Sequence, residues 1–99
     1  MKNKFPYPVK KEIFFNDKKI ILLGKSPHDI YNRNVFCVDK KENIIWQIEE
    51  FSLYPGNVKN CPYTDIQIRE GRLVLCNWCG FESIMDADTG KILERIETR

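Results

Sequence analysis

Four cysteines are the residues whose type and spacing could do chemistry. Cys76 and Cys79 are separated by two residues and followed by Gly80, which is the spacing of one half of a zinc site. Such a site would need its remaining ligands from Cys61 and from Cys37 or His28. A thiolate and imidazole set of this kind binds zinc tetrahedrally. A small cysteine-ligated zinc-binding domain is therefore one hypothesis for this chain.

The surroundings of these cysteines favour a simpler interpretation. Cys37 lies within a strand-like run, residues 33–39, and Cys76 continues another such run, so both fit a sheet better than a metal-binding turn. Cys61 has no close cysteine beside it to complete a second pair. The N-terminus lacks the apolar segment of a secretory signal, so we expect reduced thiols that pack as small apolar side chains. No metal or cofactor is expected.

Catalysis is not expected either. The chain has one histidine, and Ser26, Ser52 and Ser83 are scattered without a base at useful spacing. Nothing in the sequence pairs a nucleophile with a group that could activate it. We expect a protein that is not an enzyme.

Composition describes a small domain with unevenly distributed charge. The 99 residues are 42% hydrophobic and 30% charged, which suits one globular domain. Net charge is +2, but residues 1–25 carry +5 and residues 26–99 carry −3. The excess lysines lie in an arm with two prolines, so neither nucleic acid nor a membrane is an expected partner. A cytoplasmic location is expected.

Apolar runs separated by turn residues indicate strands throughout. Glu70-Gly71 is a two-residue hairpin signal, and residues 39–43 and 86–90 each begin with Asp and contain or end in a turn-forming Asn or Gly. We predict an all-β fold with about eight short antiparallel strands in two meander or blade-like units, packed as a sandwich or half-propeller. The expected single domain, residues 1–99, divides into an extended arm (1–9), a first unit (10–49), a long loop (50–64) and a second unit (65–99).

An internal repeat supports two units. Asp39 and Asp86 are 47 residues apart, and each is followed by a turn and then by an apolar strand that ends in Ile-Glu. This period is close to that of a four-stranded propeller blade. Two such units cannot close a ring, so they must pack against each other or leave a side open to a partner.

Residues 33–97 resemble a family of small bacterial β proteins. The matching segments are residues 34–39 (NVFCVD), 44–48 (IIWQI), Asn77-Trp78 with Gly80, and residues 86–92 with Thr89-Gly90. The family consists of immunity proteins encoded beside polymorphic toxins, including those of contact-dependent growth inhibition. The segment 86–93 also resembles the strand-turn repeat of quinoprotein propellers, although Glu94 stands where those repeats have tryptophan.

The resemblance implies binding to a cognate toxin C-terminal domain, with a nuclease as the expected toxin, and its neutralisation. A non-catalytic, propeller-like accessory module is the alternative. A nuclease cleft is basic, so carboxylates should speed association, while a few aromatic anchors should hold the complex. Trp46 and Trp78 lie in strand-like runs and are expected in the core. The expected partner-binding residues are therefore loop tyrosines and nearby carboxylates: Asp29, Tyr31, Glu49, Glu50, Tyr54, Tyr63 and Asp65.

Overall fold

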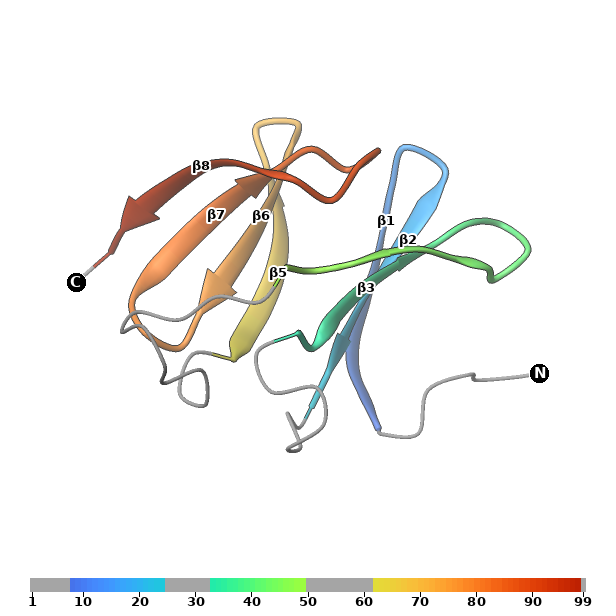
Figure 1. The fold of residues 1–99 in the computed structure, drawn as a ribbon, viewed down its shortest axis with the longest axis horizontal. Coiled ribbons are helices and arrows are strands. Elements are labelled where there is room, and N and C mark those ends of the chain that lie inside the picture. Colours follow the sequence, from blue (N-terminus) through green and yellow to red (C-terminus); the bar gives the residue numbers. More distant parts are fainter. Residues whose placement is uncertain (1–7, 25–32, 50–61, 99) are drawn as a thin grey trace.

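The structure, a computed structural model, describes residues 8–24, 33–49 and 62–98. Every regular element in these ranges is a strand, and the eight strands form two sheets of four (Figure 1). Their bounds are β1 Val9–Phe15, β2 Lys18–Leu23, β3 Val35–Val38, β4 Ile44–Gln47, β5 Tyr63–Arg69, β6 Arg72–Asn77, β7 Phe81–Met85 and β8 Ile92–Glu97. The predicted all-β fold of two meander-like units is confirmed.

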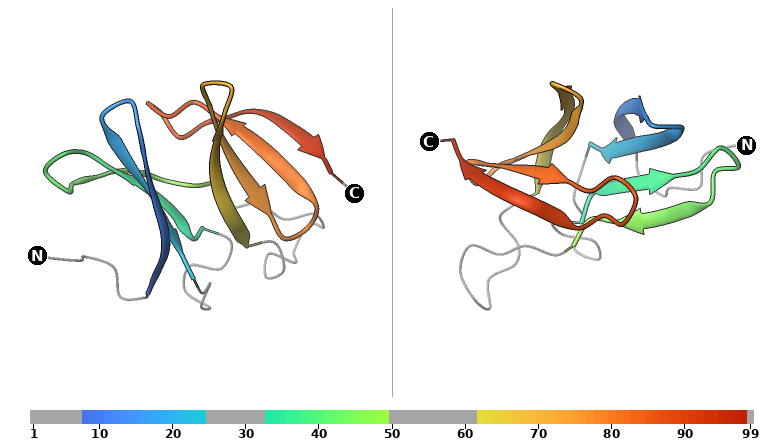
Figure 2. Two further views of the ribbon diagram at one scale, coloured as in Figure 1. Left: turned by 180° about the vertical axis from the view of Figure 1, so that it is seen from behind. Right: turned by 90° about the horizontal axis from the view of Figure 1, so that it is seen from above.

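Each sheet is an antiparallel meander in which consecutive strands are neighbours. The orders are β1-β2-β3-β4 and β5-β6-β7-β8. In the right-hand view of Figure 2 the two sheets stand beside each other, with β1 and β5 on one side and β4 and β8 on the other. The turns between their first two strands use residues in the left-handed region. These are Asn16 and Asp17, with φ of 51° and 68°, and Glu70 and Gly71, with φ of 52° and 78°. Such pairs match the right-handed twist of the strands that they connect.

The two aspartates of the sequence repeat occupy equivalent turns. The Asp39 carboxylate accepts hydrogen bonds from the Lys41 and Asn43 amides, both at 2.9 Å. The Asp86 carboxylate accepts one from the Asp88 amide at 2.9 Å. Asp39 connects β3 with β4, and Asp86 connects β7 with β8, so the repeat corresponds to the last hairpin of each sheet.

The main core lies between the two sheets. Period-two alternation points one set of side chains from each sheet into this layer, and β1 and β2 contact β5 along it. Its buried members are Ile20, Leu22, Val35, Cys37, Trp46, Ile48, Tyr63, Ile66, Leu73, Leu75, Met85 and Ala87. The first sheet is also apolar on its other face, where Ile21, Leu23, Phe36 and Val38 form a second cluster. Trp46 is thus a core residue, as predicted.

Asn34 joins the two sheets at one end of the core. It is 2% exposed, and its amide nitrogen donates to the carbonyls of Leu23 at 3.2 Å and Tyr63 at 2.9 Å. Its amide oxygen accepts from the Tyr63 backbone N–H at 3.0 Å. One buried side chain therefore satisfies backbone groups of β2 and β5 together.

Trp46 and Lys18 join the sheets at the β7–β8 turn. The indole Nε1 of Trp46 donates to the Ala87 carbonyl at 2.7 Å, and Lys18 Nζ lies 2.8 Å from an Asp88 carboxylate oxygen. The repeat turn of the second sheet thereby contacts the first sheet. In the described ranges no helix is long and apolar enough to cross a membrane.

Candidate protein-interaction surface

Trp78 is the most exposed large apolar side chain of the second sheet. It is 72% exposed, whereas its strand-like sequence predicted a core position. That prediction is wrong because β6 ends one residue earlier, at Asn77, and residues 78–80 form a turn. An exposed tryptophan carries a large apolar surface and an N–H donor, a combination that is enriched at protein interfaces.

Local hydrogen bonds fix the backbone of this turn. The Asn77 side-chain oxygen accepts from the Cys79 amide at 2.9 Å, and the Asn77 carbonyl accepts from the Gly80 amide at 3.1 Å. Gly80 has a φ of 91°, which glycine adopts without a Cβ clash. The Trp78 amide donates to the Pro62 carbonyl at 2.9 Å. The indole is thus presented from an ordered backbone.

Glu49 is an exposed carboxylate close to the same end of the sheets. It follows Ile48, whose amide donates to Val35 at 2.9 Å and whose carbonyl accepts from Arg33 Nε at 2.9 Å. These bonds hold the chain up to the residue before Glu49. Its charge is near enough to Tyr63 to contribute to the raised pKa of that phenol. Glu49 is therefore exposed at this end of the sheets, and its role in binding a partner stays a prediction.

Tyr63 cannot serve as a surface anchor in this structure. It is 3% exposed, and its hydroxyl is hydrogen bonded to Ser83. Burial raises the pKa of Tyr63 above its usual value, with the Ser83 bond opposing the shift. The expectation that Tyr63 is a loop residue facing a partner is corrected, because its ring completes the core between the sheets.

Asp65 lies on the opposite face of the second sheet from Tyr63. The register of β5 shifts between these two residues, so that Tyr63 pairs with Asn77 and Asp65 with Cys76. Without the bulge, positions two apart would share a face. Tyr63 and Asp65 therefore do not converge on one binding surface.

Asp65 belongs to a chain of polar contacts across the outer face. It accepts from Lys11 Nζ at 2.9 Å and from Gln67 Nε2 at 2.8 Å. Burial alone would raise the pKa of Asp65, but the bonds from Gln67, Lys11 and the Ile66 amide together lower it. Asp65 is thus an ionised carboxylate whose charge is already balanced by Lys11 within the protein.

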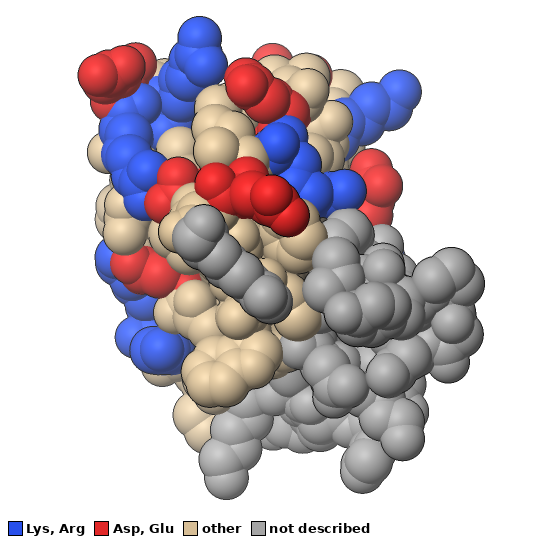
Figure 3. Space-filling view, turned by 90° about the vertical axis from the view of Figure 1, so that its left-hand side faces the viewer, with Lys and Arg blue, Asp and Glu red and all other residues tan. Residues whose placement is uncertain are grey.

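Arg69 continues this polar chain toward β7. It donates to Gln67 Oε1 at 2.7 Å and to both Glu82 carboxylate oxygens at 2.7 and 2.6 Å. The hydrogen bonds from Arg69 lower the pKa of Glu82. Figure 3, which faces the side where β8 lies, shows acidic and basic side chains interleaved. Among the described residues, the outer face therefore presents interleaved charges of both signs.

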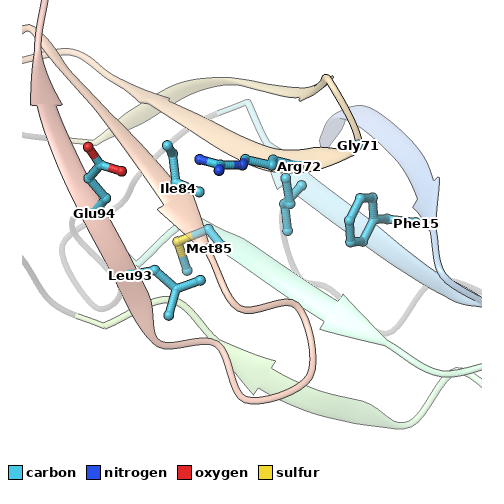
Figure 4. Close-up of a pocket in the computed structure, with 8 residues that line it drawn as sticks. Phe15, Gly71, Arg72, Ile84, Met85, Leu93 and Glu94 are labelled. Atoms are coloured by element: carbon cyan, nitrogen blue, oxygen red, sulfur yellow. The ribbon is translucent and has the colours of Figure 1, made fainter.

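A groove lies between the end of β1 and strands β6–β8, and the sequence did not predict it. Its volume is about 380 Å³. Figure 4 shows Phe15, Met85 and Leu93 along it, with Arg72 and Glu94 projecting from β6 and β8. Its lining contains no serine, cysteine or histidine among the residues that the structure describes. These residues can contact apolar and charged groups of a ligand.

The cysteines do not assemble a metal site within the described residues. Cys37 is buried in the core, whereas Cys76 is a half-buried free thiol on the outer face of the other sheet. Cys79 is disulfide-bonded, contrary to the expectation of reduced thiols throughout. No group of three or more metal-ligating side chains occurs in the described ranges. Cys61 and His28 lie outside them.

Comparison with known proteins gives a family. The sequence matches one family over residues 2–96, described as a domain of unknown function, DUF7957. The chain belongs to this family. No curated protein matches the sequence, and no solved structure matches the fold.

Most of the predicted contact set of this DUF7957 chain is not placed by the structure. Asp29, Tyr31, Glu50 and Tyr54 lie outside the described residues. Of the rest, Glu49 is exposed, Tyr63 is buried and Asp65 is engaged on another face. Trp78 is the exposed aromatic residue whose position sequence reasoning placed wrongly, in the core. The sequence signal for its exposed position was a pair of turn-forming residues, Asn77 before it and Gly80 after it.

Proposed function

We propose that this protein is a cytoplasmic immunity protein that binds and neutralises a cognate toxin domain, a nuclease. It acts by covering the active site of the toxin or a surface that the toxin requires, and not by catalysis. The resemblance of residues 33–97 to such proteins supports the class of function. The exposed Trp78 supports the mode of action, and it is the observation on which the proposal mainly depends.

Trp78 is suited to anchor a protein complex. Its backbone is already ordered by hydrogen bonds from Cys79 and Gly80 to Asn77. Because the turn need not be ordered on binding, less conformational entropy is lost. Interface energy usually concentrates in a few aromatic or arginine residues that fill a pocket on the partner. A partner with an apolar pocket beside its basic cleft would suit this indole.

The position of Trp78 links it to the surface predicted from the sequence. Its amide is bonded to Pro62, immediately after the segment 50–61. Glu49 lies immediately before that segment and is exposed. Carboxylates beside an anchor would steer a basic nuclease cleft toward it and fix its orientation. In this proposal Trp78 supplies affinity, and Glu49 with Glu50 supplies rate and orientation.

Co-expression with the toxin encoded by the neighbouring gene tests the function. Cells that produce this protein should survive the toxin, and the two purified proteins should form a complex. Continued sensitivity of those cells would refute the immunity function. Binding to the product of an unrelated neighbouring enzyme gene would support the accessory-module alternative.

Trp78→Ala tests the surface separately from the function. It should weaken toxin binding by about 2 kcal/mol or more, roughly a 30-fold rise in Kd, through a faster off-rate. Phe14→Ala is the matched control, because Phe14 is also an aromatic residue and is 73% exposed. It lies beside the β1–β2 turn, at the opposite end of the strands from Trp78 (Figure 1). Equal binding by both variants would leave the function standing and exclude Trp78 as the anchor.

A further inference from the structure

Among the described strands, β8 is the edge strand of the second sheet. It pairs with β7 along one side, and Figures 1 and 2 show no described strand along the other. Five of its six residues are exposed, including Leu93 at 65% and Ile96 at 39%. An edge of this kind presents backbone donors and acceptors on which another strand can pair.

The register shows which backbone groups face the open side. The Thr98 amide donates to the Gly80 carbonyl at 2.8 Å. Hydrogen-bonded pairs alternate along an antiparallel ladder, so Ile96 and Glu94 also direct their amides and carbonyls toward β7. The amides and carbonyls of Arg95 and Glu97 consequently point to the open side. The irregularity in the β7–β8 ladder lies nearer Ile92, so residues 94–98 form a regular segment.

We propose that a second copy of this chain occupies this edge, with the two β8 strands antiparallel about a two-fold axis at Ile96. In this register Arg95 faces Glu97 of the second copy, and Glu97 faces Arg95 of the second copy. Ile96 meets its own equivalent as the central pair. The two chains then form one continuous sheet of eight strands. This assembly is independent of the proposed toxin partner.

Charge and hydrogen bonding favour this register over its neighbours. A two-fold axis at Glu94 or at Arg95 would place identical charges directly opposite each other, which is destabilising. An axis at Leu93 would run through the irregular part of the strand. The axis at Ile96 gives two pairs of opposite charge, and the outward groups of Arg95 and Glu97 complete four backbone hydrogen bonds. Ile96 becomes a non-hydrogen-bonded pair, in which side chains approach most closely.

Sedimentation of the purified full chain, without toxin, tests the assembly. The expected Kd is on the order of 10–100 µM, because so short a ladder buries far less than the roughly 1,600 Å² of a standard interface. The weight-average mass should rise toward twice 11.8 kDa as concentration increases. A mass that stays monomeric up to about 1 mM, roughly ten times the upper end of that Kd range, would overturn the proposal.

Charge-reversed variants test the register. Arg95→Glu and Glu97→Arg should each be monomeric, because each places like charges opposite each other twice. Mixed in equal amounts they should form a heterodimer, since every glutamate of one chain then faces an arginine of the other. Arg95 also lies 6.0 Å from the Phe81 ring, so Arg95→Glu removes this contact as well as reversing the charge. Glu97→Arg keeps the contact, and loss of the dimer in this variant therefore reports on charge pairing alone. If the mixture stays monomeric while the unaltered chain dimerises, the proposed pairing is wrong.

Cross-linking provides an independent measurement. The proposed axis brings the Ile96 positions of both chains within reach of a disulfide. Ile96→Cys should therefore form a covalent dimer on mild oxidation, above the background of the unaltered chain. Leu93→Cys is the matched control, because Leu93 is more exposed on the same strand but far from its equivalent. Equal cross-linking of both variants would show random collision and contradict the register.

Discussion

Gly90 lies directly against the indole ring of Trp46, where the β7–β8 turn meets the first sheet. A Cβ atom added at Gly90 would come within 2.6 Å of Trp46 Cδ2. The same indole donates to the Ala87 carbonyl at 2.7 Å. The turn of the second sheet thus packs directly against the core tryptophan of the first sheet. A larger residue at position 90 would require the Trp46 ring to move.

Gly90→Ala should lower the free energy of unfolding by about 3 kcal/mol, from backbone strain plus the clash with Trp46. Gly71→Ala is the matched control, because Gly71 has a φ of 78° against 80° for Gly90 and nothing within 4 Å of its added Cβ. It should cost only about 1 kcal/mol, the strain alone. Urea unfolding of both variants measures the difference. Equal losses of unfolding free energy in the two variants would show that the Trp46 ring moves aside at little cost.

Asn34→Ala should be among the more destabilising single changes. It removes the partners of the Tyr63 amide and of the Leu23 and Tyr63 carbonyls. Buried backbone groups left without partners cost about 1–3 kcal/mol each, so we expect a loss of roughly 3 kcal/mol. Asn34→Asp should be no better, because a carboxylate cannot donate to either carbonyl.

Asn43→Ala is the control for this prediction. Asn43 is exposed and its side chain makes one long contact with Asp39, at 3.4 Å. Its loss should change stability by no more than about 0.5 kcal/mol. Thermal unfolding of the three variants makes the comparison. A loss as small for Asn34→Ala as for Asn43→Ala would mean that water replaces the buried amide.

Local sequence signals were sufficient to predict the strands and hairpins. The Glu70-Gly71 turn and the aspartates at 39 and 86 act on amides within four residues, so their effect can be read from adjacent positions. The alternation of apolar residues then indicated strands, although it did not identify which faces pack together. This is why the two meander units could be predicted without knowing how the sheets pair.

The features that decide the candidate surface depend on longer-range structure. Tyr63 became a core residue because a bulge separates it from the face of Asp65, and nothing in the adjacent sequence marks the bulge. Asn34 looked like an ordinary polar residue, but its partners are 11 and 29 residues away. The exposure of Trp78, in contrast, depends on neighbouring residues. Asn77 and Gly80 are turn-forming residues, and together they indicate that the strand ends before Trp78.

Fluorescence should separate the chain's two tryptophans. Trp46 is 8% exposed and Trp78 is 72% exposed. Trp78→Phe should therefore leave blue-shifted emission that acrylamide quenches weakly. Trp46→Phe should leave red-shifted emission that is quenched strongly, at the cost of the bond to Ala87. Strong quenching of the Trp78→Phe protein under native conditions would contradict the packing of the core.

Cys37 should make the protein less stable at alkaline pH. Burial raises the pKa of its thiol from 9.0 to about 11; Lys18 opposes this shift, and Asp88 and Asp39 add to it. The folded protein therefore keeps a proton that the unfolded chain loses. The contribution to stability is complete below pH 9.0, and it falls as the pH rises toward about 11.

Cys37→Ala should remove this part of the alkaline decline. At neutral pH the variant should be less stable by about 1 kcal/mol, because a small buried side chain is truncated. That deficit should shrink as the pH rises from 9 to 11, since only the unaltered chain loses the thiol contribution. Tyr63, whose pKa is also raised, titrates in both proteins and cancels in the difference. Urea unfolding across this range measures the deficit. A deficit that stays constant would show that the Cys37 thiol does not titrate differently on folding.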